Sequence, residues 1–225
     1  MQLENSNQAE EKVLCFPRAL LGSYSSQVIF FDQFIWDRIQ CNLFRRPRSL
    51  AERDTMYKQL VAYVVIKLGN KYLTYKRTEK GAEERLWTKY SIGVGGHVNE
   101  GDRQRVLFDS GFFDRAVQRE IDEELIFEKG YKLSKPCLSR FINDDLDDIG
   151  KAHFGLVLVA ELEKENFLLE GDSEIKNAVK GKKGLCEIEF CNIQSMRVGK
   201  ASFERWSQLL IDYMYNGGVL DKVLE

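Results

Sequence analysis

Three glutamates near the middle of the chain have a spacing at which carboxylates can hold a metal ion. Glu120, Glu123 and Glu124 stand at positions i, i+3 and i+4 of "QREIDEEL", so they share one face if the segment is helical. Like charges at this spacing repel one another by roughly 0.2–0.5 kcal/mol per pair, and a divalent cation would offset that repulsion. Carboxylate oxygens suit Mg²⁺ or Mn²⁺. The alternative is a solvated acidic helix face, since Glu is a good helix former.

A glycine turn precedes this acidic segment. "YSIGVGGHV" has the pattern of a strand that runs into Gly95 and Gly96, and a polar loop with Asp102 follows. Glycine lets a main chain approach a ligand closely, so the Gly95 carbonyl is a candidate fourth oxygen. Arg119 stands next to Glu120 and is placed to pair with one carboxylate. Taken alone, a glycine pair before a loop is an ordinary turn.

The acidic segment needs a helix to position it. Val117, Ile121 and Leu125 are spaced by four and form an apolar stripe beside the glutamates. We therefore expect a helix in "GFFDRAVQREIDEELIFEK" that packs on a sheet through this stripe. Gly130 follows the segment and fits a C-terminal cap.

The remaining pattern predicts strands on both sides of that helix. "QLVAYVVIKL" and "KYLTYKR" form a hairpin signal around Gly69-Asn70, and "AHFGLVLVAELE" and "LCEIEFCNI" are further strands. "FFDQFIWDRIQCNLF" and "ASFERWSQLLIDYMYN" have helical periodicity. These elements predict an α+β fold, a mixed α/β/α sandwich. We expect an N-terminal extension over residues 1–55, made of a strand and a helix packed on a main domain over residues 56–225 that ends in the C-terminal helix.

Composition narrows the class of protein. The chain is 44% hydrophobic and 30% charged with a formal net charge of −2, which gives no attraction to nucleic acid or to a membrane surface. No apolar run approaches the ~20 residues of a membrane span, and the polar start lacks a targeting signal, so we expect a cytoplasmic protein. Five cysteines are an odd number, which favours reduced thiols. With only two histidines, carboxylates are favoured over a zinc site.

The glycine turn and the acidic helix together resemble the signature of the Nudix hydrolase superfamily. In that signature a glycine, an acid six residues on and an Arg-Glu-x-x-Glu-Glu core form a loop–helix–loop. The positions that match are Gly96, Asp102 (where the family has Glu), Arg119, Glu120, Glu123 and Glu124. The resemblance covers roughly residues 58–200. The segments "FRRPRSLAERD", "YSIGVGGHV" and "RWSQLL" resemble a little-characterised bacterial subgroup of predicted phosphoesterases.

Two features depart from the family pattern. Residues 103–118 separate Asp102 from Arg119, whereas the family has seven residues there. The extra nine fall in "RQRVLFDSG", residues 103–111, and we expect them to shape the substrate pocket; the alternative is that their apolar residues only anchor the loop. Ile126 stands where the family has glycine, which suggests that the helix continues to Gly130.

The resemblance implies a Nudix-type fold and an Mg²⁺- (or Mn²⁺-) dependent pyrophosphohydrolase. Its substrate would be a small-molecule phosphoanhydride, a diphosphate linked to another group X, such as a nucleoside diphosphate derivative. The implied metal ligands are Glu120, Glu123, Glu124 and Gly95, and the implied catalytic residues are Glu120, Glu123 and Arg119. Arg77, Arg85, Gly96 and Asp102 are candidates for substrate binding. The proton acceptor often lies outside the signature, and Glu161, Glu174 and Glu187 stay open.

Several alternatives remain at this stage. The chain could be a catalytically weak Nudix-fold module for ligand binding or regulation, although its intact core argues against this. Isomerase chemistry needs a cysteine near the site, and the sequence has none near the glycine turn. We expect structural roles for His97 and His153, a solvated turn for "NDDLDD" and a basic turn for "VKGKKG". A homodimer is left open.

Overall fold

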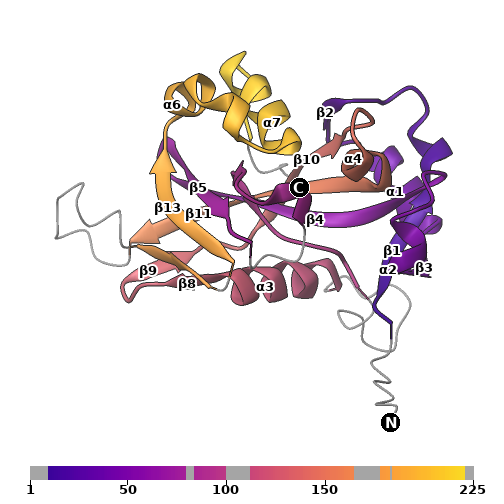
Figure 1. The fold of residues 1–225 in the computed structure, drawn as a ribbon, viewed down its shortest axis with the longest axis horizontal. Helices are drawn as coiled ribbons and strands as arrows, with labels where there is room; N and C mark the ends of the chain where they lie inside the picture. Colours follow the sequence, from indigo (N-terminus) through magenta and orange to yellow (C-terminus); the bar gives the residue numbers. More distant parts are fainter. Residues whose placement is uncertain (1–9, 80–83, 100–111, 165–177, 183, 221–225) are drawn as a thin grey trace, which may run out of the picture.

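A large mixed β-sheet with helices on both faces forms the body of the protein (Figure 1). The computed structural model describes residues 10–79, 84–99, 112–164, 178–182 and 184–220. The strands are β1 (Lys12–Pro17), β2 (Gln27–Phe30), β3 (Phe44–Pro47), β4 (Tyr57–Leu68), β5 (Lys71–Arg77), β6 (Tyr90–Ser91), β7 (Gly93–Val94), β8 (Leu125–Phe127), β9 (Tyr131–Leu133), β10 (Cys137–Asn143), β11 (His153–Lys164), β12 (Val179–Gly181) and β13 (Leu185–Cys191). The helices are α1 (Gln33–Cys41), α2 (Arg48–Ala51), α3 (Phe112–Glu124), α4 (Asp148–Ala152), α6 (Ile193–Val198) and α7 (Arg205–Tyr215), with short 3₁₀ turns at η1 (Arg18–Leu21), η2 (Glu84–Leu86) and η4 (Lys200–Ser202). The architecture confirms the predicted α+β fold.

The two longest strands lie side by side at the centre of the sheet. The strand order is β13-β5-β4-β11-β10-β2, and β4 and β11 run parallel, from the pair Gln59 and His153 to the pair Lys67 and Glu161. Parallel strands need a long crossover, and α3 lies in the chain between these two. β4 and β5 form the hairpin predicted at Gly69-Asn70. The centre of the sheet is thus built from segments about a hundred residues apart.

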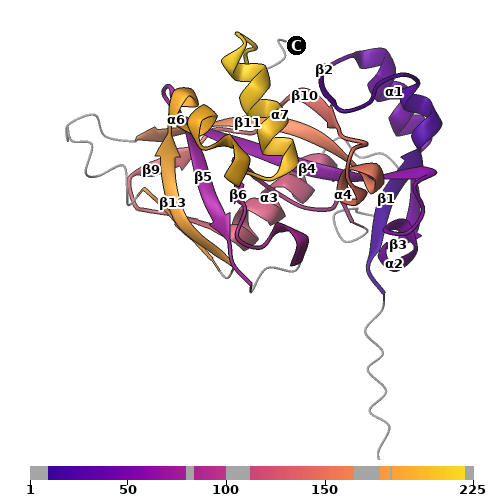
Figure 2. The same cartoon turned by 45° about the horizontal axis from the view of Figure 1, so that its top comes forward.

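The two faces of the sheet carry separate apolar cores, because successive side chains of a strand point to opposite faces. One core collects Leu60 and Ala62 of β4 together with Val117 and Ile121 of α3 and Leu125, the first residue of β8. The predicted stripe on α3 is therefore confirmed. The other core lies under α6 and α7, which cover the opposite face (Figures 1 and 2), and contains Tyr63, Val157 and Trp206.

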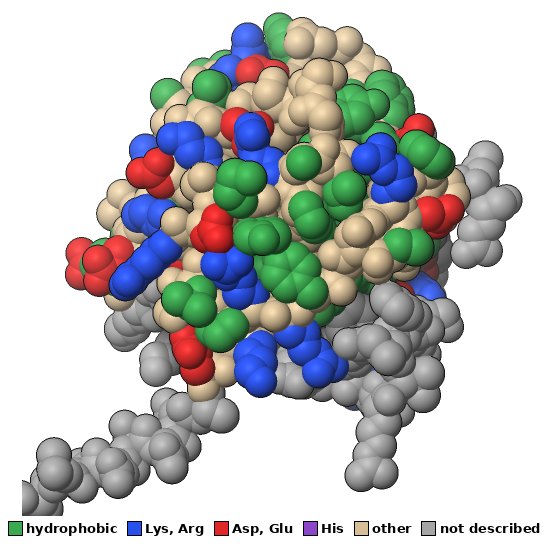
Figure 3. All heavy atoms as spheres, turned by 90° about the vertical axis from the view of Figure 1, so that its right-hand side faces the viewer, with side chains coloured by type: hydrophobic (Ala, Val, Ile, Leu, Met, Phe, Trp, Pro, Cys, Tyr) green, Lys and Arg blue, Asp and Glu red, His purple; other side chains and the backbone are tan. Residues whose placement is uncertain are grey.

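The N-terminal segment adds strands to the same sheet. β1 pairs with both β3 and β4, and β2 pairs with β10. Figure 3 views this end of the molecule and shows hydrophobic side chains among Lys and Arg. Exposed apolar residues in this segment include Phe30, Phe34, Leu50 and Met56. The division at residue 55 stays a prediction.

None of the helices within the described residues is long and apolar enough to cross a membrane.

The prediction that the helix of the three glutamates continues to Gly130 is wrong. α3 ends at Glu124, and the next three residues form β8, which pairs antiparallel with β12. β12 includes part of "VKGKKG", so the basic turn predicted there is also partly a strand. Each strand supplies hydrogen-bond partners for the backbone N–H and C=O groups of the other. This long-range pairing outweighs the helical periodicity of the local sequence.

The prediction of a solvated turn at "NDDLDD" is wrong for the first half of the segment, whereas Leu146 and Asp148 in the second half are exposed. Asn143 and Asp144 are fully buried. Asp145 forms an ion pair of 2.7 Å with the buried Lys58, whose ammonium also donates to the Gly150 carbonyl at 2.6 Å. The acidic segment can be partly buried because Lys58, from the distant strand β4, supplies a positive charge beside it.

Candidate active site

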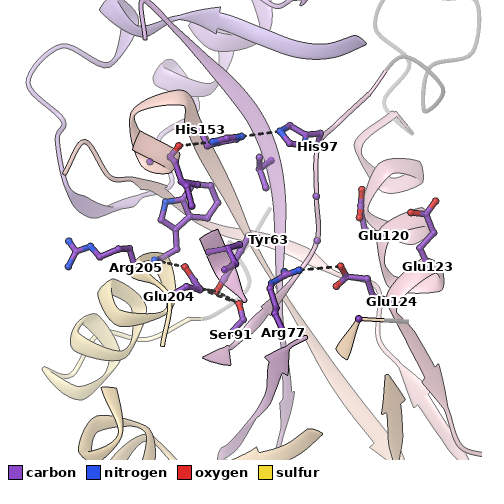
Figure 4. Close-up of a pocket in the computed structure, with 18 of the residues that line it drawn as sticks. Tyr63, Arg77, Ser91, His97, Glu120, Glu123, Glu124, His153, Glu204 and Arg205 are labelled. Atoms are coloured by element: carbon purple, nitrogen blue, oxygen red, sulfur yellow. Dashed lines mark hydrogen bonds and ion pairs between the residues drawn. The ribbon is translucent and has the colours of Figure 1, made fainter. Parts of the chain in front are cut away.

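Helix α3 presents its three glutamates in three different environments. Glu120 is 8% exposed, Glu124 has one fifth of its side chain exposed, and Glu123 is 59% exposed. Figure 4 shows Glu120 and Glu124 on the side of the helix nearer the glycine turn and Arg77, and Glu123 on its outer side. The buried pair is thus set toward the pocket, one turn apart.

The glycine turn fits against α3 and the sheet because it has no side chains. A Cβ built on Gly95 would collide with the carbonyl oxygen of Ala62 on β4. A Cβ on Gly96 would lie 2.6 Å from the Glu120 carboxylate. The Gly96 carbonyl accepts a hydrogen bond from the Ala62 amide (3.0 Å), which holds the turn along β4. Both glycines are therefore required by close approach, one to a strand and one to a metal-ligand candidate.

Arg119 joins the turn to the helix. Its Nη1 donates to Glu120 at 2.7 Å and lies 3.4 Å from Glu123, while its Nη2 donates to the His97 carbonyl at 3.0 Å. One guanidinium therefore fixes the orientation of a glutamate relative to the glycine turn. The expected pairing of Arg119 with a carboxylate is present.

Glu124 faces Arg77 at the end of β5. Their charged groups are 3.7 Å apart. Burial raises the pKa of Glu124 to about 7; Arg77 lowers it, and the charges of Glu120 and Glu123 add to the rise. Its Oε2 is buried and has no hydrogen-bond partner among the described residues. A buried acceptor oxygen beside two further carboxylates fits a divalent cation.

The glutamates form one wall of a pocket of about 400 Å³. A second wall carries His97 and His153, and a third is the start of α7, with Glu204 and Arg205 (Figure 4). Tyr63 and Trp206 also line the pocket. A cavity of this size that contains both charged and aromatic groups suits a small charged ligand.

Sequence reasoning missed the third wall. Glu204 caps α7, accepting from the amides of Trp206 and Ser207 (2.8 Å each), and it also accepts from the Tyr63 hydroxyl at 2.7 Å. Arg205 pairs with the buried Asp144 at 3.0 Å. An acidic residue at the start of an amphipathic helix indicates a helix cap, but the local sequence does not predict that this cap faces α3.

The two histidines meet in the second wall. Their Nε2 atoms are 3.0 Å apart, and the Nδ1 of His153 bonds the Ile149 carbonyl at 2.6 Å. Burial, together with the nearby His153, lowers the pKa of His97 to about 3. Glu52 lies 3.7 Å from the His153 Nε2; desolvation raises the pKa of Glu52, but the histidines and Arg48 outweigh this and lower it to about 2. The expected structural hydrogen bond of His97 is thus made to the other histidine.

The other predicted residues lie in varied places. Arg85 is 3.7 Å from Glu52, and in the described part of the chain it does not line the pocket. Glu161 pairs with Lys67 at 2.9 Å, and Glu187 bonds Lys76 and Tyr90; neither lines the pocket as described. Asp102, Glu174 and the insertion at 103–111 lie outside the described residues.

The fold is also found in solved structures. Tm1382, a protein classed with the Nudix hydrolases, matches at a TM-score of 0.67 and 21% identity, with 92% of this chain and 99% of that chain covered. A Nudix hydrolase from Nitrosomonas europaea matches at 0.43 and 16% identity, over 75% of this chain and 96% of its own, which is too distant to add to the argument. The fold of this chain is therefore the Nudix-type fold of Tm1382, and its Arg119–Glu124 segment resembles the core of the Nudix signature.

A curated relative narrows the family further. Protein YmaB of Bacillus subtilis (strain 168) is 31% identical over 167 residues, which cover 74% of this chain and 76% of YmaB. The chain belongs to the same family as YmaB. No protein-family model matches it.

Proposed function

We propose that this protein is an Mg²⁺- (or Mn²⁺-) dependent pyrophosphohydrolase that cleaves a diphosphate linked to another group X. The observation that carries the proposal is that Glu120 lies against Gly96 and that Glu124, one helical turn further on, lines the same pocket. Both carboxylates are largely buried, and burying several like charges is unfavourable unless a cation accompanies them. The Nudix fold supports this reading, because a phosphoanhydride is the substrate that the resemblance implies.

The proposed metal ligands are Glu120, Glu123 and Glu124, with the Gly95 carbonyl as a fourth oxygen. A bound divalent ion would neutralise phosphate oxygens and lower the pKa of a coordinated water. Arg119 acts on Glu120 by holding its carboxylate through a 2.7 Å hydrogen bond. Arg77 faces Glu124 and has the charge to meet a phosphate as well. Gly96 leaves room for the Glu120 carboxylate.

Group X is proposed to occupy the wall opposite the glutamates. Trp206 and Tyr63 line the pocket there, and an aromatic wall suits a nucleoside base better than a second phosphate. The Trp206 ring nitrogen is buried and has no hydrogen-bond partner in the described part of the chain. We therefore propose nucleoside diphosphate derivatives as the substrate class.

A phosphate-release screen tests this function. Purified protein is incubated with nucleotide sugars, dinucleotide polyphosphates, NADH, ADP-ribose and nucleoside triphosphates, with and without Mg²⁺. We expect Mg²⁺-dependent turnover of at least one of them, and its loss in Glu120→Gln, which removes the charge but keeps the volume. Asp122→Asn is the matched control, because Asp122 lies on the same helix, is exposed and bonds Gln118 at 2.8 Å.

Two results would count against hydrolysis. Full turnover in Glu120→Gln would place the chemistry away from α3. Binding of these compounds without any turnover in the presence of Mg²⁺ would instead favour a ligand-binding module, and calorimetry with the same compounds detects that case.

A further inference from the structure

A second group of metal-ligand candidates lies at the pocket wall that carries His97 and His153, and it is built from different residues than the glutamates of α3. Glu52, His97 and His153 each offer one ligand atom, and these atoms all lie within 4.8 Å of one another. The three residues come from segments far apart in the sequence: the end of α2, the glycine turn and the start of β11. Figure 4 shows the two imidazoles side by side, joined by the hydrogen bond between their Nε2 atoms.

The strand register explains why the imidazoles meet. His153 pairs with Gln59 of β4, and His97 forms a bridge with Val61 two residues further along the same strand. Paired residues point to the same face of a sheet, so both histidines stand on one face of β4 and reach over it from opposite sides. This pairing sets their Nε2 atoms 3.0 Å apart.

Helix α2 brings the carboxylate to the same place. Its last residue, Ala51, is buried against Val13 and Cys15 of β1, and Cys15 pairs with Gln59. Glu52 follows directly and lies 3.7 Å from the His153 Nε2. Arg48 also approaches this Oε1 at 3.5 Å, and Arg85 approaches the other oxygen, Oε2, at 3.7 Å, so two guanidiniums hold the carboxylate in position.

The hydrogen bonding of His153 is that of a metal ligand. Its Nδ1 lies 2.6 Å from the Ile149 carbonyl, an acceptor, so Nδ1 carries the proton and Nε2 presents a lone pair in the neutral ring. Metal-ligating histidines almost always donate their other N–H to a carbonyl or a carboxylate. The His153 lone pair is directed at the His97 Nε2, where one ion could take both nitrogens.

The side chain of Gln59 is a buried amide in register with this group. Gln59 is fully buried, and neither its Nε2 nor its Oε1 has a hydrogen-bond partner among the residues described. Since Gln59 pairs with His153, its side chain belongs to the same face of the sheet. Buried polar groups are nearly always satisfied, so the Gln59 amide is a polar group that needs a partner on the face of the sheet that carries His153.

We propose that Glu52, His97 and His153 bind a divalent transition-metal ion, Zn²⁺ in the first place, at a site separate from the carboxylate site of α3. Two imidazoles and one carboxylate suit Zn²⁺, whereas Mg²⁺ prefers oxygen ligands only. This revises the expectation that two histidines make zinc unlikely, and it does not depend on the proposed hydrolysis.

The small number of histidines makes the test direct. The chain has two histidines and both are in the group, so in a protein freed of any affinity tag every histidine signal reports on this site. We expect Zn²⁺ titration, followed by long-range ¹H–¹⁵N imidazole spectra, to shift both rings together and to saturate at one ion per chain. Mg²⁺ should leave both rings in their metal-free positions. Imidazole spectra unchanged by Zn²⁺ would overturn the proposal, and this measurement needs no variant.

Variants then place the ion. His153→Asn and Glu52→Gln should each weaken Zn²⁺ affinity by about tenfold or more, measured by competition with a chelating dye. Glu11→Gln is the matched control, because Glu11 lines the same pocket and pairs with Arg48 but offers no ligand to the group. Glu120→Gln should also leave Zn²⁺ affinity unchanged. If Glu120→Gln weakens Zn²⁺ binding as much as His153→Asn does, the ion sits on α3 and the proposal is wrong.

Discussion

The carboxylate of Glu120 occupies the space in which a side chain at position 96 would begin, because a Cβ on Gly96 would lie 2.6 Å from Glu120 Oε1. At Gly95 the obstacle is different: it is the backbone carbonyl of Ala62 on the central strand. A carboxylate at the end of a flexible side chain can move aside, whereas a carbonyl in a sheet cannot. The two neighbouring glycines should therefore respond differently to the same substitution.

We expect Gly96→Ala to keep the fold and to lose metal affinity. The added methyl group displaces Glu120, so Mg²⁺ affinity measured by calorimetry should fall by about tenfold or more with little change in melting temperature. Gly95→Ala is the comparison. It should lower the free energy of unfolding by about 2 kcal/mol or more, because the sheet must shift. A Gly96→Ala protein that kept the Mg²⁺ affinity of the wild type would contradict this reading.

Arg119→Lys should slow catalysis while the substrate still binds. A guanidinium donates to Glu120 and to the His97 carbonyl with two different nitrogens (2.7 and 3.0 Å), and a single ammonium cannot reproduce that fork. A small misplacement of Glu120 should reduce kcat by about tenfold to a hundredfold, with KM changed less. Arg115→Lys, one turn earlier on α3 and outside the residues that line the pocket as described, is the control. If both variants lose kcat equally, Arg119 has no special positioning role.

Glu124→Gln should stabilise the metal-free protein at alkaline pH. Burial raises the pKa of Glu124 to about 7 in the folded state, so the folded protein holds this proton more tightly than the unfolded chain does. The ionised carboxyl therefore reduces stability as pH rises from its ordinary pKa toward 7 and beyond. At pH 8 the variant should be more stable by on the order of 1–3 kcal/mol, and the difference should vanish near pH 4. Urea unfolding in a chelator at both pH values measures this; a difference independent of pH would contradict it.

The same shift sets the pH dependence of metal binding. Because a carboxyl must lose its proton to bind a cation, Mg²⁺ affinity of the wild type should rise as pH increases through about 7. In Glu124→Gln this rise should disappear, since the titrating group is gone. Calorimetric titrations at pH 6 and pH 8 compare the two proteins.

Lys58→Met should destabilise the fold more than other lysine substitutions. Lys58 is fully buried and pairs with Asp145 at 2.7 Å and with the Gly150 carbonyl at 2.6 Å. Removing the cation leaves Asp145 without the closer of its two ion-pair partners, because Arg18 is 2.9 Å away and half exposed. We expect a loss of about 3 kcal/mol. Lys151→Met, which breaks an exposed pair with Asp148, should change stability by less than about 0.5 kcal/mol.

The sequence by itself determined the parts that depend on local periodicity. The stripe of Val117, Ile121 and Leu125 predicts both the helix and the face that it buries, because residues four apart lie on one side of a helix. The same spacing places Glu120 and Glu124 together. The hairpin at Gly69-Asn70 also depends on adjacent residues. These predictions need only the geometry of one element or of two consecutive ones.

Only the tertiary structure decided which segments far apart in the sequence pair with or contact one another. α3 stops at Glu124 because β8 finds a partner in β12, more than fifty residues later. The acidic segment around Asp145 turns inward because Lys58 reaches it from β4. His97 and His153 meet because β4 and β11 pair in parallel with one particular register. Such pairings are set by the packing of the whole sheet, so the two isolated histidines of the sequence carry no sign that they share a site with Glu52.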